Sequence, residues 1–112
     1  MNDCVFCKII AGEIPSEIVY QDEDVAVFPD INPATPVHLL IIPRKHIESL
    51  EDMGGDNQIM AKMVRAARVV AAEKGLDKQG YRLTINNGAD AGQIVPHLHM
   101  HLMGGRQLGW QH

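Results

Sequence analysis

The spacing of apolar residues predicts one long amphipathic helix in the middle of the chain. Between residues 56 and 74 the apolar side chains recur every three or four positions, which is the period of a helix that buries one face. Asp56 suits the N-cap of this helix, and Gly75 suits the position that ends it. The apolar stripe comprises Ile59, Met60, Met63, Val64, Ala67, Val70 and Ala71.

Shorter apolar segments on both sides of this helix predict strands. Residues 18–21 and 25–28 flank a turn-prone acidic stretch and predict a hairpin. Residues 37–42 are apolar at both parities, so the pattern predicts a strand that is buried on both faces. Residues 81–86 alternate between apolar and polar, and residues 98–103 predict a last strand that stops at a Gly-Gly pair.

The order of these elements predicts an α+β fold. A mainly antiparallel five-stranded sheet would carry the long helix on one face, and residues 4–11 predict a short N-terminal helix or turn. The chain contains no repeat, low-complexity tract or linker, so residues 1–112 are expected to form a single domain.

Composition narrows the classes of function. The 112 residues carry a net charge of −4, which argues against a general nucleic-acid binder but allows a small anionic ligand. No apolar run is long enough to span a membrane, and the first ten residues lack the apolar region of a signal peptide. We therefore expect a cytoplasmic protein that binds neither nucleic acid nor membrane, with its two cysteines reduced.

The most informative segment alternates histidine with apolar residues. Side chains two apart in a strand share a face, so His97, His99 and His101 are expected in a row. Such a row suits either a transition metal or a nucleophilic imidazole with neighbouring donors. In the preceding loop, Gly88 and Gly92 would let backbone N–H groups approach an anion, although a plain hairpin connection is the alternative.

Motifs along nearly the whole chain resemble the histidine triad (HIT) family, and within it the Hint branch of nucleoside phosphoramidate hydrolases. The triad with its apolar neighbours is highly specific, and the Gly-Gly-Arg ending is similar to the Hint branch. The other matching segments are residues 6–10, 13–15, 28–33, 35–38, 42–47, 92–93 and 104–107.

The resemblance implies a role for each histidine of the reaction centre. His99 is expected to be the nucleophile, held in one tautomer by a backbone carbonyl. His101 is expected to donate to the phosphate and the leaving group. His38 resembles the family's fourth histidine, which supports this cluster, although its position among apolar residues also allows an ordinary buried role.

The resemblance also implies a nucleotide site. Asp30 is expected to accept both ribose hydroxyls. Asn86, Gly92 and Gln93 are expected to hold the phosphate and the leaving group. The base pocket is expected to be walled by Phe6, Ile9, Phe28 and Ile31, and for the first three an ordinary core position is an equally good interpretation.

Cys4-x-x-Cys7 has the spacing of metal ligands, but it supplies only half of a zinc site. The resemblance implies that His46 and His97 complete a structural zinc site, which would fix the N-terminal segment to the sheet. The alternative is two free thiols, with His46 at the surface and His97 orienting the row.

Two positions depart from the Hint pattern, and the tail carries a further expectation. Ile94 replaces a serine that touches the phosphate or the leaving group, and Pro96 replaces an aromatic residue. Relatives are homodimers in which the tail reaches the partner's site, so Trp110 is expected either to do so or to pack on the dimer surface. The sheet would then extend across the dimer.

The function implied is hydrolysis of purine nucleoside 5′-phosphoramidates through a covalent nucleotidyl-histidine, with no cofactor required for the chemistry. The sequence does not rank adenine against guanine. Three alternatives remain open. These are a nucleotide-binding adaptor or sensor with little turnover, a dinucleoside polyphosphate hydrolase, and a metalloenzyme with zinc on all three histidines of the row.

Overall fold

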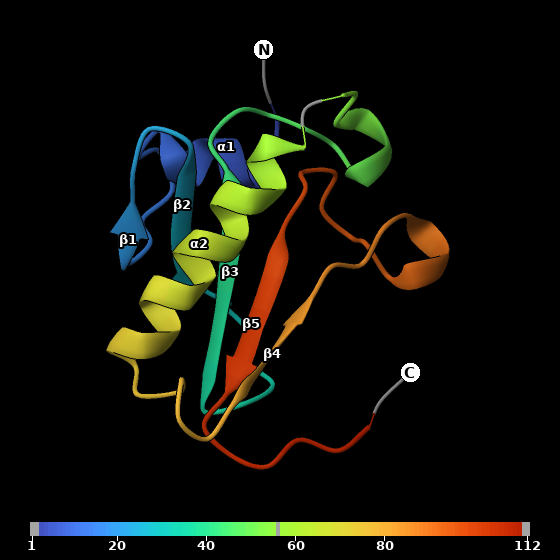
Figure 1. Ribbon diagram of the computed structural model, residues 1–112. Helices are drawn as coiled ribbons and strands as arrows, with labels where there is room; N and C mark the ends of the chain where they lie inside the picture. Colours follow the sequence, from blue (N-terminus) through green and yellow to red (C-terminus); the bar gives the residue numbers. More distant parts are fainter. Residues whose placement is uncertain (1–2, 56, 111–112) are drawn as a thin grey trace.

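A computed structural model describes residues 3–55 and 57–110 of the chain. Its centre is a five-stranded sheet in the order β1-β2-β3-β5-β4, and every neighbouring pair of strands is antiparallel (Figure 1). The strands are β1 (Tyr20–Gln21), β2 (Val25–Pro29), β3 (Val37–Pro43), β4 (Tyr81–Thr84) and β5 (Met100–Gly104). The α+β class predicted from the sequence is confirmed.

The long helix α2 (Gln58–Glu73) covers one face of the sheet. Its buried residues are Ile59, Met63, Ala66, Ala67, Val70 and Ala71, so the predicted stripe faces the core, while Met60 and Val64 lie at its half-buried edges. The helix ends before Gly75, which has a φ of +74° as the prediction required. The predicted cap Asp56 lies outside the described residues.

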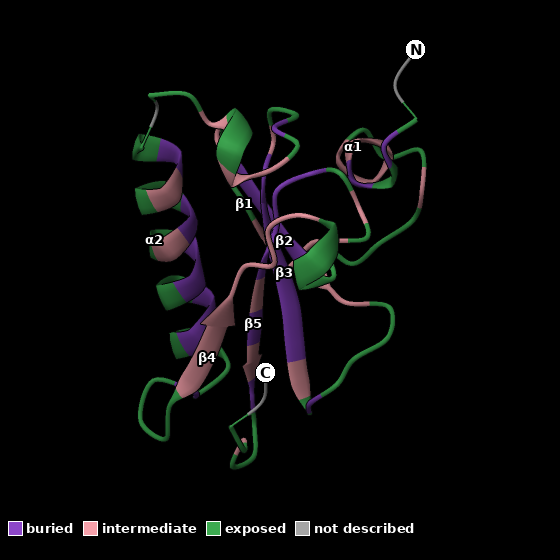
Figure 2. Cartoon of the chain, turned by 90° about the vertical axis from the view of Figure 1, so that its right-hand side faces the viewer, coloured by how far each residue is buried: buried purple, intermediate pink, exposed green. Residues whose placement is uncertain are grey.

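The short helix α1 (Val5–Ile10) lies on the opposite side of the sheet from α2 (Figure 2). Strand β3 is therefore buried on both faces, as its apolar run predicted. Leu39 and Ile41 pack in the cluster under α2, whereas Leu40 and Ile42 pack with Phe6 of α1. The sheet thus separates two apolar clusters, and the α1 side is the smaller.

Three strand boundaries differ from the prediction by two residues, and three others by one. The first strand contains only residues 20–21 of the predicted 18–21, and β4 ends at Thr84 rather than at residue 86. Strand β5 begins at Met100, because pairing with β3 stops at Ile41↔Met100 and the Leu98 N–H donates instead to the Ile47 carbonyl at 2.6 Å. His97 and His99 therefore precede the strand, and the three histidines do not form one row on a strand face.

Two one-turn 3₁₀ segments, Leu50–Asp52 and Ala89–Ala91, lie in the connections at the end of the sheet where α1 packs. Within the described residues, every helix is too short or too polar to cross a membrane. Strands β1 and β4 form the two edges of the sheet. The expected homodimer stays a prediction.

Candidate active site

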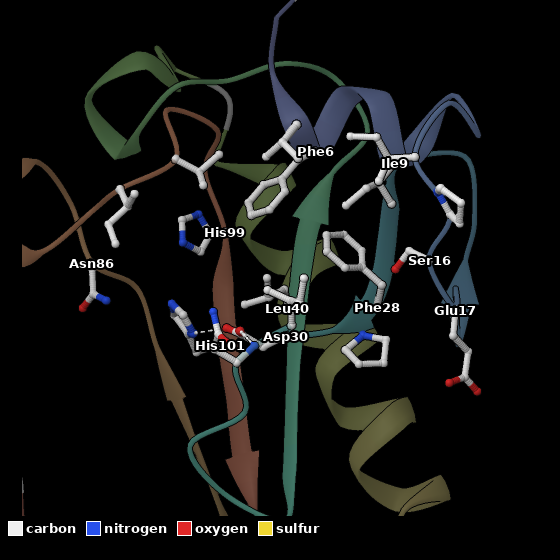
Figure 3. Close-up of a pocket in the computed structure, with 18 of the residues that line it drawn as sticks. Phe6, Ile9, Ser16, Glu17, Phe28, Asp30, Leu40, Asn86, His99 and His101 are labelled. Carbon is white, nitrogen blue, oxygen red and sulfur yellow. Dashed lines mark hydrogen bonds and ion pairs between the residues drawn. The ribbon is translucent and has the colours of Figure 1, made fainter.

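A cavity of about 550 Å³ opens on the α1 face of the sheet (Figure 3). Register explains why the side chains that line it meet, since Phe28 pairs with Leu40 and Leu40 pairs with His101 across β2, β3 and β5. Residues directly opposite in neighbouring strands share a face. Helix α1, the segment before β1 and the loops after β2 and before β5 complete the wall. The lining residues are Val5, Phe6, Ile9, Ile14, Pro15, Ser16, Glu17, Phe28, Pro29, Asp30, Ile31, Asn32, Leu40, Asn86, Gly92, Ile94, Val95, His99 and His101.

His99 is held in one tautomer. Its Nδ1 lies 2.7 Å from the carbonyl oxygen of His97. Because a carbonyl only accepts, Nδ1 carries the proton and Nε2 keeps its lone pair. The ring is 8% exposed and lies edge-to-face with Phe6, with 5.2 Å between the ring centroids. In this tautomer the ring presents Nε2 as its one basic nitrogen beside the cavity.

A hydrogen-bond chain fixes the tautomers of His38 and His101. The Ala34 N–H donates to His38 Nδ1 at 2.9 Å, so His38 carries its proton on Nε2. That nitrogen lies 2.9 Å from His101 Nδ1, which therefore accepts and leaves Nε2 of His101 as the donor. Burial lowers the pKa of His101, and the neighbouring His99 and His38 lower it further, while Asp30 opposes the shift.

Asp30 joins this chain at the beginning of the loop after β2. Its Oδ2 lies 3.4 Å from His38 Nε2 and 4.0 Å from His101 Nδ1. Its Oδ1 accepts from the Asn32 N–H at 2.8 Å. The carboxylate is therefore oriented by its own loop, and both oxygens keep further lone pairs for a ligand in the cavity.

The four residues predicted to wall a base pocket all line the cavity. Phe6 and Phe28 meet edge-to-face, with 5.5 Å between their centroids, and both are buried in the α1-side cluster. Ile31 is 91% exposed, which is unusual for a large apolar side chain and leaves its surface available to a ligand. Phe6, Ile9 and Phe28 thus serve both the core and the cavity wall.

The predicted phosphate-binding loop is only partly arranged as expected. Asn86 and Gly92 line the cavity, but Gln93 does not. Gln93 Oε1 accepts from the Gly88 N–H at 2.8 Å, and its Nε2 donates to the carbonyls of Glu48 and Val95. The Gly92 N–H donates to the Ala89 carbonyl. The N–H groups of Gly88 and Gly92 themselves are therefore used to close the loop, and the approach of other backbone N–H groups of the loop to an anion stays a prediction.

Several lining residues were missed by sequence reasoning. Leu40 has the same strand parity as His38, and that signal could have placed it on this face. Ser16 and Glu17 lie in an irregular segment after α1, where no periodicity indicates orientation. Trp110 is 82% exposed and does not line the cavity of its own chain, so its role stays a prediction.

The four predicted metal ligands converge beside the cavity. The ligand atoms of Cys4, Cys7, His46 and His97 all lie within 4.8 Å of one another. His97 Nδ1 is 3.2 Å from His46 Nδ1, 3.3 Å from Cys4 Sγ and 3.6 Å from Cys7 Sγ, and Cys7 Sγ is 3.4 Å from His46 Nδ1.

These separations fit a tetrahedral zinc ion. Bonds of about 2.0–2.1 Å to nitrogen and about 2.3 Å to sulfur place two nitrogens about 3.3 Å apart, and a nitrogen about 3.5 Å from a sulfur. His97 Nε2 donates to the Pro43 carbonyl at 2.8 Å, so its Nδ1 holds the lone pair that a metal requires. Burial is the main cause that lowers the pKa of His97, which keeps the ring neutral.

The same geometry contradicts the interpretation of zinc on all three histidines of the triad. His97 uses one ring nitrogen on Pro43 and turns the other toward the two cysteines. Within the described residues, neither group of potential metal ligands contains His97, His99 and His101 together.

Comparison with known proteins places this chain in a family. The HIT domain profile matches residues 11–108, and the chain belongs to the HIT family. It is 45% identical over 109 residues to the purine nucleoside phosphoramidase of Escherichia coli K12, covering 96% of this chain and 92% of that protein.

Solved structures agree with this assignment. A HIT family hydrolase from Clostridium thermocellum is 49% identical and superposes with a TM-score of 0.94, covering 99% of this chain and 97% of the other. A zinc-bound histidine triad family protein from Mycobacterium smegmatis is 36% identical with a TM-score of 0.82, covering 93% of this chain and 76% of the other.

Proposed function

We propose that this chain hydrolyses purine nucleoside 5′-phosphoramidates through a transient bond between the α-phosphorus and His99. The observation that carries the proposal is the His99 tautomer, since the carbonyl of His97 leaves Nε2 unprotonated beside the cavity. The activity named for the E. coli relative supports the substrate class. The apolar wall takes the purine and Asp30 accepts the ribose hydroxyls, so the phosphate lies next to the histidines.

In the first step, His99 Nε2 attacks the phosphorus and the bond to the amine nitrogen breaks. The His101 Nε2–H group donates a hydrogen bond to the leaving nitrogen, and the proton that this nitrogen gains comes from solvent water. The Asp30 carboxylate, 3.4 Å from His38 Nε2, keeps the His38 proton on that nitrogen. The products are a free amine and a nucleotidyl-His99.

In the second step, water attacks the same phosphorus and the bond to His99 breaks. The proton that the attacking water loses returns to solvent, which balances the proton taken up in the first step, and a nucleoside monophosphate is released. The Asn86 side-chain amide makes no hydrogen bond within the described part of the chain and lines the cavity, so it is available to the phosphoryl oxygens.

Trapping the covalent species tests this proposal. The wild-type protein is mixed with adenosine 5′-phosphoramidate labelled in the adenosine, quenched in base because phosphohistidines are acid-labile, and mapped by mass spectrometry. We expect the label on His99. We also expect His99→Ala to lose turnover and to retain AMP binding. Turnover by His99→Ala at the wild-type rate would refute the mechanism.

The same assay separates the alternatives. A binding protein with little turnover would bind AMP without releasing amine. A dinucleoside polyphosphate hydrolase would release AMP from diadenosine polyphosphates faster than from the phosphoramidate.

The cluster of Cys4, Cys7, His46 and His97 holds zinc in this proposal. The fit of the donor separations and the zinc-bound relative support it. The ion would stabilise the fold and takes no part in the two chemical steps. Metal analysis of the purified protein is expected to give one zinc per chain, and Cys7→Ser is expected to lose it.

The protein is a homodimer in this proposal, with Trp110 near the partner's site. The 82% exposure of Trp110 supports a surface role for this side chain. Sedimentation is expected to give twice the mass of one chain. A monomer at assay concentration would refute this part while leaving the chemistry intact.

A further inference from the structure

We propose that Cys4, Cys7 and His97 are positioning residues of the nucleotide site, so that metal and nucleotide bind cooperatively. The inference rests on the proposed function and goes beyond a purely structural role for the metal. Two separate connections lead from the cluster to the cavity, one through α1 and one through the backbone of His97.

The first connection runs through α1. Cys4 is the N-cap of this helix and Cys7 lies within it, while Phe6 and Ile9 of the same helix line the cavity. The two metal-binding sulfurs and the two wall residues thus belong to one segment of six residues and its cap. Any change that releases the sulfurs also releases the wall against which the base would pack.

Polar contacts of this cluster join helix α1 to residues that are distant in the sequence. It contains six residues, and helices of this length are not stable on their own in water. Its own backbone bonds are local, and the hydrogen bonds that join it to the rest of the described chain run from Cys4 and Cys7 to His97 and His46. Its apolar contacts with the sheet come from Phe6, which is buried, and from Ile9 and Ile10, which are partly buried.

The second connection runs through His97. Its ring nitrogen lies in the metal cluster, and its carbonyl oxygen receives the Nδ1 proton of His99 at 2.7 Å. The ring is fully buried and is held on its other side by the Pro43 carbonyl. When the His97 ring is a metal ligand, the His97 backbone is fixed in place. The His97 carbonyl, which sets the tautomer and orientation of His99, is then fixed as well.

These connections predict a reciprocal effect on affinity. If metal binding raises the affinity for AMP by some factor, thermodynamic linkage requires AMP to raise the affinity for metal by the same factor. Without metal, α1 would be ordered for only part of the time, and the apparent dissociation constant of AMP would rise in proportion. We expect a factor of about ten or more, since both the wall and the nucleophile are affected.

The test uses full-length wild-type protein stripped with a chelator and reloaded with zinc. AMP affinity is measured by calorimetry on both forms well below the melting temperature, and zinc affinity is measured against a competing chelator with and without AMP. Circular dichroism checks that the sheet and α2 remain folded. The expected result is an AMP dissociation constant at least about tenfold weaker in the stripped form, with an equal gain in zinc affinity when AMP is present.

Two variants separate coupling from general destabilisation. Cys7→Ser is expected to bind AMP as weakly as stripped wild type, and added zinc is expected to give no recovery. Val70→Ala, in α2 on the other face of the sheet, is expected to melt at a lower temperature yet bind AMP normally when loaded. Equal weakening in both variants would refute the coupling.

The outcomes also separate this inference from the proposed function. Equal AMP affinity in stripped and reloaded protein would overturn the coupling while the mechanism stands. A reloaded protein that neither binds nor hydrolyses the nucleotide would instead overturn the proposed function.

Discussion

Replacing Gly105 by alanine is expected to destabilise the fold more than the same change at Gly75, Gly104 or Gly109. Gly105 follows β5 and has a φ of +97°, a region that residues with a side chain rarely adopt. A Cβ atom there would lie 2.9 Å from Cβ of Pro36 and 3.4 Å from the backbone nitrogen of Val37. Pro36 and Val37 lie between Ala34 and His38, whose hydrogen bond sets the His38 tautomer, so a shift at this contact also affects the site.

Two costs add at this position. The left-handed backbone costs about 1–2 kcal/mol for a residue with a Cβ. Displacing the rigid Pro36 ring adds about 1–3 kcal/mol, as overpacking does in other well-packed sites. The free energy of unfolding should fall by about 2–5 kcal/mol, and the melting temperature by roughly 8–20 °C at about 4 °C per kcal/mol for a domain of this size.

Urea denaturation of a series of glycine variants measures each cost separately. Gly75→Ala has the positive φ without a neighbour within 4 Å, so it carries the backbone cost alone. Gly104→Ala meets a flexible Leu76 methyl at 3.0 Å without a positive φ, and Gly109→Ala has neither feature. We expect losses in the order Gly105, Gly75, Gly104, Gly109. If Gly105→Ala lost no more than Gly75→Ala, the close approach of Pro36 would be refuted.

Three further changes test other parts of the structure. The pKa of His101 is lowered in the folded state, so the unfolded chain binds more protons than the folded chain just below pH 6.5. The free energy of unfolding should therefore fall as the pH drops from 6.5 toward the pKa of the folded state. Urea titrations at several pH values should show a smaller loss for His101→Gln. Met63→Ala shortens a fully buried side chain of α2 and should lower the free energy of unfolding by about 2–5 kcal/mol in the same assay. A loss below about 1 kcal/mol would contradict the packing described. Ile94 is 90% exposed at the cavity, so Ile94→Ser should change the free energy of unfolding by no more than about 0.5 kcal/mol. In this variant, kcat/KM should fall for phosphoramidates of long alkylamines relative to the phosphoramidate of lysine. An unchanged ratio would show that Ile94 does not contact the leaving group.

Much of the fold could be predicted because the strongest patterns are periodic. The stripe on α2 and the apolar run of β3 each have one physical interpretation, and both faces of β3 are buried as its composition requires. The beginning of β5 could not be predicted in the same way. Alternation continues through residues 97–99, but the Leu98 N–H is bonded to Ile47, a contact between distant segments that no local pattern encodes.

The candidate site shows the same division. His38, His99 and His101 were predicted from a motif and lie together with the expected neighbours. The N–H groups of Gly88 and Gly92 bond within the loop, and sequence does not say whether a loop N–H group bonds to the protein or to a ligand. In this loop, Gln93 Oε1 accepts from the Gly88 N–H and Gln93 Nε2 donates to the Glu48 carbonyl.

Strand β3 has a practical consequence for engineering. Val37, Leu39 and Ile41 pack in the cluster under α2, and Leu40 and Ile42 pack in the α1 cluster, so one seven-residue segment supplies two separate apolar layers, one odd-numbered and one even-numbered. Mutational effects in layers without shared contacts combine nearly additively. Thermal tolerance could therefore be raised by redesigning the odd layer, and substrate range altered by redesigning the even layer, in parallel libraries that are merged only at the end.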